Sequence, residues 1–472
     1  MSRRILLVLE LAVVALALLQ IGEVASTMRA RWSFPGDIEW MEGATLVSAM
    51  RVRDGLPLYA TPSPDWIPFI YPPLHAWILG VLSHVFPLGY GLGRAVSIVG
   101  FVGSCAALAY AARQEGARLA SALGCVGLFV GTYENSGTFF DLVRTDALSM
   151  ALLGWSLALG AGTSARSHIA SGLVLALAFV SKQHVAMFGI VMAPALAVRF
   201  GWRRGLAFGL AAALPALAFV VAMNVASDGL FLRFLIEVPA THGMVRARLI
   251  PGAQFEVWKA APITLTAALV GGVWLWRRAY WSLISGMALL VVSLMRGHTG
   301  GYLNVLIPMM WVVSLWPALA MRELRWAWVP HVGLVLLGAQ LWQGRASLRR
   351  FEPRPADVVE LSALIEEIRE LPEPVLMPHA PYYPVLAGKK PSFGLITLWD
   401  IDHDDGPFRG GVKRIRDAIT DHHWASIVLP DDKLGFGLKD AYRRDHILRA
   451  RPVATKTGWP VRIRSVWVPD VQ

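Results

Sequence analysis

The stretch ILLVLELAVVALALLQIGEVA, residues 5–25, follows Arg3 and Arg4 and is apolar except at Glu10, Gln20 and Glu23. About 20 such residues are enough to cross a hydrocarbon core of about 30 Å as a helix. Glu10 inside the run, and the lack of a small-residue cleavage site before Glu23, favour a retained first helix over a signal peptide. Similar runs recur as far as Trp342, so the sequence predicts a polytopic α-helical membrane protein.

The composition of the whole chain supports this class. Of its 472 residues 55% are hydrophobic and only 16% charged, which is too apolar for a soluble globular protein of this length. Residues 346–472 hold 19 Lys/Arg and 18 Asp/Glu, so nearly all of the net charge of +11 lies in the preceding membrane part. We therefore interpret the basic pI as a topology signal and expect no nucleic-acid partner. The only cysteines, Cys105 and Cys125, fall in predicted membrane helices, which excludes a disulfide framework.

Hydropathy and loop charge predict the topology. We expect eleven crossings, at residues 5–25, 94–112, 119–133, 146–162, 169–181, 184–198, 205–226, 261–276, 280–295, 303–320 and 326–343. The short connections on the side of the N-terminus hold most of the loop arginines, which predicts a cytoplasmic N-terminus and an extracytoplasmic C-terminus. The apolar stretch 72–86 contains His75 and His84 and is short, so we expect a re-entrant or interfacial helix there. The predicted location is the inner (plasma) membrane, where membrane lipids surround the chain.

Two domains follow from this topology. Residues 1–345 form the membrane domain, with a first outer loop at 26–93 and a second, basic and aromatic one at 227–260. Residues 346–472 are predicted to form a small extracytoplasmic α/β domain, with helices at 357–371 and 411–419 and strands at 375–377 and 426–429. The acidic run at 400–405 does not fit the spacing of a calcium loop, and we expect it to be solvated.

Polar residues gather at the predicted outer membrane face. Ionisable groups near the hydrocarbon are costly, roughly 2.5–3.5 kcal/mol at a helix centre, and therefore indicate candidate working sites. The group consists of Asp37, Glu39, Tyr71, Arg94, Asp141, Arg144, Asp146, Lys182, Gln183, His184, Arg296, His298, Tyr302 and Asn304. At helical spacing Asp141 and Arg144 share a face, whereas Asp146 points elsewhere. Each loop alone is also explained by a solvated turn or a headgroup anchor, but together they indicate one site.

The order of the motifs resembles the membrane glycosyltransferases of the GT-C fold, especially the branch of protein O-mannosyltransferases and lipid A aminoarabinose transferases. The resemblance covers roughly residues 5–345 and rests on four elements in sequence order: Asp37-Ile38-Glu39, Tyr71-Pro72-Pro73-Leu74, Arg94 and Arg144-Thr145-Asp146. In this chain one residue separates the two acids, which are commonly adjacent in the O-mannosyltransferases. That departure leaves open whether Asp37 or Glu39 is the catalytic group.

The resemblance implies an inverting transfer of a sugar from a polyprenyl-phosphate donor to a hydroxyl of a lipid, glycan or protein acceptor at the outer face. Asp37 is our first choice of general base and Glu39 its rival. Arg94, Arg144, Lys182 and Arg296 are the expected ligands of the donor phosphate. Tyr71, Asp141, Asp146, Gln183, His184, His298, Tyr302 and Asn304 are expected to support the substrates. A cofactor is not defined: Mg²⁺ or Mn²⁺ on Asp37, Glu39 and Asp146 is one possibility.

Two other classes of protein compete with this interpretation. A transporter or lipid flippase would line its path with the same charges, but such proteins often contain inverted repeats, and no internal repeat is evident. A membrane anchor for the C-terminal domain would leave the acidic loops without a role.

Overall fold

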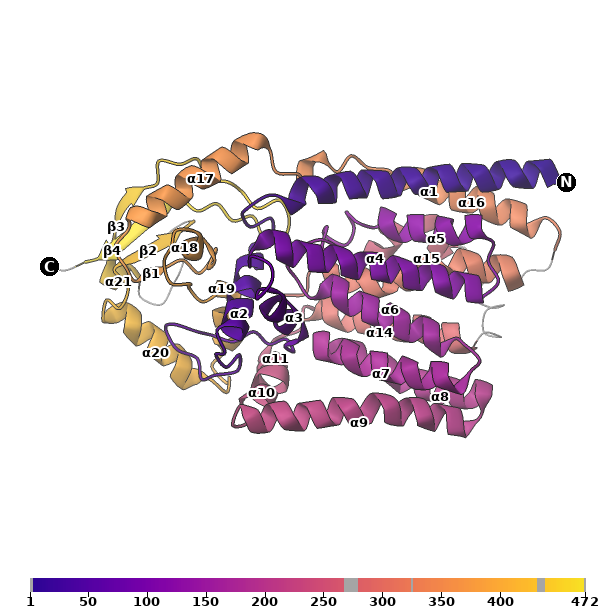
Figure 1. The fold of residues 1–472 in the computed structure, drawn as a ribbon, viewed down its shortest axis with the longest axis horizontal. Helices are drawn as coiled ribbons and strands as arrows, with labels where there is room; N and C mark the ends of the chain where they lie inside the picture. Colours follow the sequence, from indigo (N-terminus) through magenta and orange to yellow (C-terminus); the bar gives the residue numbers. More distant parts are fainter. Residues whose placement is uncertain (1–2, 267–278, 324–325, 431–437, 471–472) are drawn as a thin grey trace.

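The computed structural model describes residues 3–266, 279–323, 326–430 and 438–470. A bundle of helices forms one part of the molecule, and a smaller C-terminal unit caps one end of it (Figure 1). The N-terminus lies at the far end of the bundle from this unit (Figure 1). Helices α2, α3 and α19 lie where the bundle and the C-terminal unit meet (Figure 1).

The bundle consists of long apolar helices. They are α1 (Arg3–Trp32), α4 (Tyr90–Gln114), α5 (Leu119–Gly131), α6 (Asp146–Gly160), α7 (Ala165–Ser181), α8 (Phe188–Phe200), α9 (Trp202–Ala226), α14 (Ala279–Gly297), α15 (Ile307–Glu323) and α16 (Val329–Gln343). In the described chain six helical stretches are long and apolar enough to span a membrane: α1, α4, α9, α14, α8 with its preceding turn, and α15 with its preceding turn. The chain is thus a multi-pass membrane protein. Most of the predicted span 261–276 lies outside the described residues, and each other predicted span coincides with a helix.

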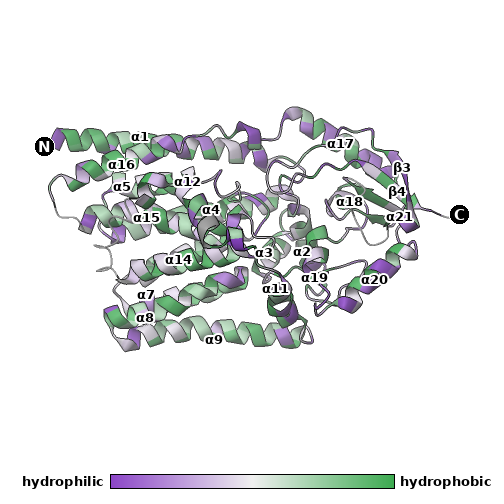
Figure 2. Ribbon diagram, turned by 180° about the vertical axis from the view of Figure 1, so that it is seen from behind, coloured by the Kyte–Doolittle hydropathy of each residue, from purple (hydrophilic) through white to green (hydrophobic). Residues whose placement is uncertain are grey.

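Glycines allow the helices of the bundle to approach closely. A Cβ on Gly100 of α4 would stand 2.8 Å from the backbone nitrogen of Leu148 in α6, so only glycine fits there. Contacts of this kind are typical of packing between membrane helices. On the outside, α9 exposes the apolar side chains of Leu206, Leu210, Leu214 and Leu217, and the bundle is largely hydrophobic (Figure 2). Such a surface is stable in lipid and not in water.

The two connections that were predicted to be outer loops contain short helices. The first holds α2 (Glu42–Arg53) and α3 (Leu74–Leu82), and the second holds α10 (Leu230–Leu232), a π-helical turn (Arg233–Glu237), α11 (Val238–Thr241), a 3-10 turn (Arg246–Arg248) and α12 (Ile250–Ala260). Further 3-10 turns precede α8 (Gln183–Met187) and α15 (Leu303–Leu306). The nine residues of α3 rise only about 14 Å, which is too short for a helix to span a hydrocarbon core of about 30 Å.

The C-terminal unit is a small mixed sheet with helices. Its elements are a 3-10 turn (Arg349–Phe351), α17 (Pro355–Glu370), β1 (Val375–Leu376), α18 (Tyr383–Leu386), α19 (Leu395–Ile401), α20 (Arg409–Thr420), β2 (Ser426–Leu429), α21 (Leu438–Ala441), β3 (Tyr442–Ile447) and β4 (Ser465–Pro469). The strand order is β1-β2-β4-β3, with β1 parallel to β2 and the other pairs antiparallel. The predicted helices and strands of this unit are present, while β3 and β4 were not predicted.

The C-terminal unit packs directly onto the first outer loop. One hydrophobic core runs from the membrane helices through Ile38 to Tyr383 and Leu361. The backbone nitrogen of Asp37 donates to the hydroxyl of Tyr383 at 3.1 Å, and that of Lys456 donates to the carbonyl of Ile38 at 2.8 Å. The unit therefore covers the loop that carries Asp37 and Glu39.

Candidate active site

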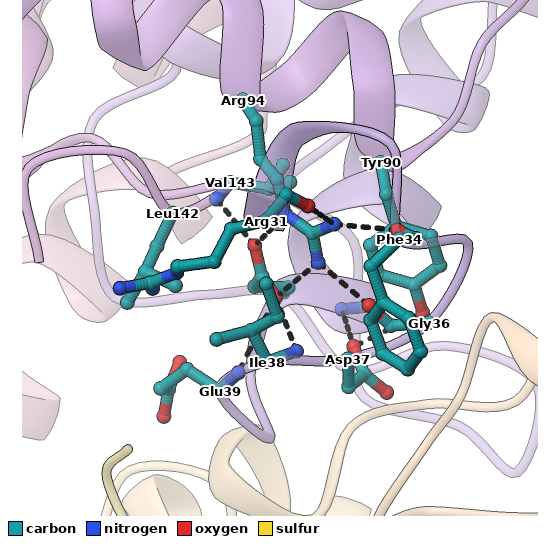
Figure 3. A network of polar contacts seen from close by, with 12 residues as sticks. Arg31, Phe34, Gly36, Asp37, Ile38, Glu39, Tyr90, Arg94, Leu142 and Val143 are labelled. Carbon is teal, nitrogen blue, oxygen red and sulfur yellow. Dashed lines mark hydrogen bonds and ion pairs between the residues drawn. The ribbon is translucent and has the colours of Figure 1, made fainter. Parts of the chain in front are cut away.

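A buried arginine shapes the loop between α1 and α2. Nε and Nη2 of Arg94, on α4, donate to the two carboxylate oxygens of Glu42 at 3.0 and 2.8 Å. The remaining donors bind the carbonyls of Arg31, Phe34 and Gly36. The guanidinium thus reaches the loop from the helix above it (Figure 3). All its donors are used by the protein, so Arg94 holds the loop in place and offers no free donor to the phosphate that it was predicted to bind.

Glu42 completes this anchor and was not among the residues predicted for the site. Besides Arg94, its carboxylate accepts from the backbone nitrogens of Ile38 at 2.7 Å and Val143 at 2.8 Å. Burial alone would raise the pKa of Glu42, but Arg94 and these N–H donors outweigh it and hold the pKa below its usual value. Glu42 therefore ties the loop 37–39 to the segment before Arg144. Its position three residues after Glu39, at the start of a helix, was the available signal.

Asp37 is fixed within this framework. Its Oδ1 accepts from the backbone nitrogen of Gly43 at 2.9 Å and from the hydroxyl of Tyr90 at 3.0 Å. Its Oδ2 is buried without a hydrogen-bond partner among the described residues. Burial and the nearby charge of Glu42 raise the pKa of Asp37 well above its usual value. Asp37 thus positions the start of α2 through its contacts with Gly43 and Tyr90.

Glu39 leaves the loop in the opposite direction from Asp37 (Figure 3). Its Oε2 accepts from the backbone nitrogen of Met41 at 3.2 Å and lies 3.5 Å from Nη1 of Arg144. Burial raises the pKa of Glu39 to about 7, although the positive charge of Arg144 opposes this shift. A carboxylate with this pKa exchanges protons near neutral pH.

A row of charges continues from Glu39 into the bundle. Nε of Arg144 lies 3.8 Å from Asp146, which accepts from Nζ of Lys182 at 2.6 Å and from the amide of Asn304 at 2.7 Å. The expectation that Asp146 points away from Arg144 is therefore wrong, because the segment before α6 is not helical and its side chains follow no helical spacing. Glu39, Arg144, Asp146, Lys182 and Asn304 form what we call the charge row.

A small cavity opens beside the charge row. It has a volume of about 50 Å³, and its lining includes Tyr71, His75 and Arg144. The ring of Tyr71 lies 5.9 Å from the guanidinium carbon of Arg144 and 5.8 Å from Nζ of Lys182. Both ring nitrogens of His75 are buried without a hydrogen-bond partner in the described part of the chain. The cavity thus presents a cation, a phenol and an imidazole, and the ring nitrogens of that imidazole are free to bind a ligand.

Other predicted residues are placed elsewhere. Arg296 pairs with both oxygens of Glu256 at 2.7 Å, so the structure does not bring it together with Arg144 and Lys182, the other cations predicted to bind the donor phosphate. The ring of His298 lies tilted against that of His242, with 4.8 Å between the ring centroids. Asp141 lies 3.3 Å from Nε of Arg31, not beside Arg144, and accepts from Tyr133.

The last three predicted residues lie nearer the site. His184 borders a narrow cavity together with Asp146, Lys182 and Asn304. The amide of Gln183 donates to the carbonyl of Ile70 at 3.1 Å. The ring of Tyr302 packs against Phe139, 5.5 Å between centroids, and Phe139 in turn lies 5.7 Å from the guanidinium carbon of Arg144.

The C-terminal unit adds groups that sequence reasoning missed. Asp400, which we expected in a solvated loop, is largely buried, with Oδ1 3.8 Å from Nε2 of His242. Burial raises its pKa to about 7, against the opposing charge of Arg144. Asp402 is partly exposed and pairs with Arg416, and Asp405 is fully exposed and pairs with Arg409. The burial of Asp400 could not be predicted, because nothing in residues 395–405 indicates that this segment docks onto a membrane loop.

The predicted metal ligands are not brought together. Asp37 and Glu39 point apart, and Asp146 is already paired with Lys182. Across residues 3–266, 279–323, 326–430 and 438–470, no group of three or more His, Cys, Asp or Glu side chains is arranged to hold a metal ion. These residues do not fit the suggested Mg²⁺ or Mn²⁺ site, and we derive no step through a metal.

A polytopic bundle whose first outer loop is folded beneath a docked C-terminal unit defines the class: the chain has the GT-C fold, as the resemblance implied. It is similar over nearly its whole length to the crystal structure of ArnT from Cupriavidus metallidurans in the apo state, with a TM-score of 0.60, 15% identity and 96% of this chain and 97% of that chain covered. The structure of that ArnT bound to undecaprenyl phosphate gives a TM-score of 0.58 at 14% identity, with 96% and 98% covered. No protein-family model and no curated protein matches the chain. At this identity the likeness establishes the fold.

Proposed function

We propose that the chain transfers a sugar from a polyprenyl-phosphate donor to an acceptor hydroxyl at the extracytoplasmic face of the inner membrane, with inversion at the anomeric carbon. The observation that carries the proposal is the charge row beside the cavity, at the end of the bundle that the C-terminal unit covers. The fold supports it, since one ArnT structure of this fold was solved with undecaprenyl phosphate bound.

Arg144 is the group best placed to bind the leaving phosphate. Its ion pairs with Glu39 and Asp146 are long, at 3.5 and 3.8 Å, and its Nη1 donates to the sulfur of Met41 at 2.7 Å. A phosphate oxygen would be a stronger acceptor than that sulfur, and a guanidinium binds phosphate through two parallel hydrogen bonds. Lys182 holds Asp146, so the row keeps Arg144 in place while leaving donors for the substrate.

Glu39 serves as the general base in this proposal, in place of our first choice from the sequence, Asp37. The acceptor oxygen forms a bond to the anomeric carbon as the bond from that carbon to the phosphate oxygen breaks, and the hydroxyl proton passes to Glu39. The lipid phosphate leaves with the negative charge, opposite Arg144. Glu39 lies 3.5 Å from Arg144 and has a pKa of about 7, whereas Asp37 binds Gly43 and Tyr90 and is held by the loop.

The transporter alternative has less support. The row lies at helix ends: Asp146 is the first residue of α6, Lys182 directly follows α7, and Asn304 lies in the turn before α15. A translocation path would need polar groups near the middle of the bilayer as well.

The deciding experiment is donor turnover. Purified protein in nanodiscs is incubated with a panel of radiolabelled polyprenyl-phosphate sugars and a membrane extract, and loss of label from the donor is followed. We expect turnover by the wild type, loss of about 100-fold or more in Glu39→Gln, and a smaller loss in Asp37→Asn. No turnover of any donor would contradict the proposed function. An equal loss of turnover in both variants, with folding intact, would contradict the assignment of Glu39 over Asp37 as the general base.

A further inference from the structure

Three tryptophans from distant parts of the chain meet beside Glu39. Trp40 belongs to the first outer loop, Trp399 to α19 and Trp459 to the segment between β3 and β4. Their ring centroids lie 5.3 Å apart for Trp40 and Trp459, 5.2 Å for Trp399 and Trp459, and 5.9 Å for Trp40 and Trp399. We call these three residues the indole platform.

The indole platform is open on one side. Trp40 is only 8% exposed and forms its base, whereas Trp399 and Trp459 are 41% and 42% exposed. Aromatic side chains that serve only to pack a core bury most of their surface, since that burial is what stabilises them. Two large rings held together at the surface therefore offer an apolar face to a ligand.

The polar edges of the indoles are also unused. Within the described residues no hydrogen bond is formed by the indole N–H of Trp40, Trp399 or Trp459, although those of Trp66, Trp281, Trp311 and Trp467 all have protein acceptors. A ligand that combines an apolar C–H face with hydroxyl acceptors satisfies both the rings and the N–H groups. A pyranose ring has this chemistry, and an acyl chain lacks the acceptors.

The indole platform is coupled to the candidate base through backbone contacts. A Cβ on Gly458 would lie 2.9 Å from Cγ of Glu39, so the residue before Trp459 lies directly on that side chain. The hydroxyl of Thr457 donates to the carbonyl of Gly137 at 2.5 Å, and its backbone nitrogen to the carbonyl of Ile38 at 3.2 Å. Glu39 is thus in contact on one side with the residue before Trp459, and Trp40 follows it in the chain.

We propose that the indole platform binds a sugar ring of the acceptor and presents its hydroxyl to Glu39, so that the acceptor is a glycan or the carbohydrate headgroup of a glycolipid. This inference rests on the proposed function and names the substrate class of the same site. It also gives the C-terminal unit a part in acceptor choice, because two of the three rings belong to it.

The kinetic test separates acceptor from donor. Trp399→Ala and Trp459→Ala are each expected to raise KM for a carbohydrate acceptor about tenfold, the order of a lost aromatic contact, while KM for the donor stays unchanged. Trp202→Ala removes an indole that is 66% exposed at the start of α9 and serves as the control. Trp399→Phe retains a ring and is expected to recover part of the affinity. Unchanged acceptor KM in both alanine variants would overturn the inference.

A binding test works without turnover. The wild type is labelled with 5-fluorotryptophan in nanodiscs, and the resonances of Trp399 and Trp459 are assigned from the two alanine variants. Maltohexaose and cellohexaose are expected to shift both resonances saturably, whereas a serine-containing hexapeptide does not. Shifts with the peptide alone, with added anionic lipid alone, or with none of the probes would each overturn the inference. If the saccharides bind but no donor turns over, the proposed function fails and the carbohydrate site stands.

Discussion

Arg94 and Glu42 form a fully buried bidentate ion pair, with nitrogen–oxygen distances of 3.0 and 2.8 Å, between α4 and the start of α2. The same two side chains bind the backbone of residues 31–38 and of Val143. The acidic loop and the segment before Arg144 are therefore held by one pair, which brings Glu39 and Arg144 within reach of each other.

Breaking this pair is expected to unfold the site. Glu42→Gln leaves Arg94 buried without a counter-charge, which costs about 3–5 kcal/mol in comparable buried pairs. Thermal unfolding in nanodiscs or detergent measures the effect. Glu366→Gln is the matched control, because its pair with Arg369 is exposed and worth at most about 1 kcal/mol. Equal stability of the two variants would show that Arg94 does not depend on Glu42.

The two arginines Arg144 and Arg296 provide a second contrast. Arg144→Ala is expected to lower transfer by about a hundredfold or more, the cost of removing one preorganised group from a developing anion. Arg296→Ala is expected to leave donor turnover nearly unchanged, because its guanidinium already binds Glu256. Initial rates with a radiolabelled donor, compared at matched amounts of folded protein, measure both. A larger loss in Arg296→Ala than in Arg144→Ala would contradict the assignment of the phosphate site.

The rate of transfer is expected to rise with pH through about 7. A general base acts in its ionised form, and the pKa of Glu39 is raised to about 7, so the ionised fraction falls about tenfold for each pH unit below that value. The positive charge of Arg144 lowers this pKa, and Arg144→Gln should therefore move the midpoint of the residual activity to higher pH. Profiles of kcat/KM between pH 5 and 9 test this. A midpoint that does not move in Arg144→Gln would mean that another group titrates.

The elements of the fold could be predicted from the sequence because their signals are local. The apolar runs from α1 to α16 and the short stretch around α3 follow from hydropathy, and α17 follows from its period of 3.6 residues. β3 and β4 were missed because β3 is mostly exposed, with polar side chains such as Arg443 and Arg444, and its pairing with β4 depends on residues some 20 positions away. The ordered motifs similarly contain Glu39, Arg144 and Asp146, whose side chains lie near one another in the structure.

The partners within the site could not be predicted because they depend on three-dimensional contacts. The sequence does not show whether a charged residue near the membrane surface is free or ion-paired. Arg94 and Arg296 were therefore assigned the same role as Arg144. Only the structure shows that the donors of Arg94 are all used and that Arg296 binds Glu256. Asp400, Gly458 and Trp459 lie more than 350 residues from Glu39, and no local pattern connects them.

The contact between Gly458 and Glu39 yields the last prediction. Gly458 has a φ of +72°, and a Cβ there would lie 2.9 Å from Cγ of Glu39. Gly388 has a similar φ of +79°, but nothing lies within 4 Å of its Cβ position. Alanine at either position incurs about 1–2 kcal/mol of backbone strain, so the two variants should lose similar stability in thermal unfolding. Only Gly458→Ala also displaces Glu39. Because small misplacements of reacting groups slow catalysis strongly, we expect at least a tenfold loss of transfer in that variant. Gly388→Ala should show near-normal turnover. If Gly458→Ala retained full activity, the segment around Trp459 would not position the base, and the C-terminal unit would act on the acceptor alone.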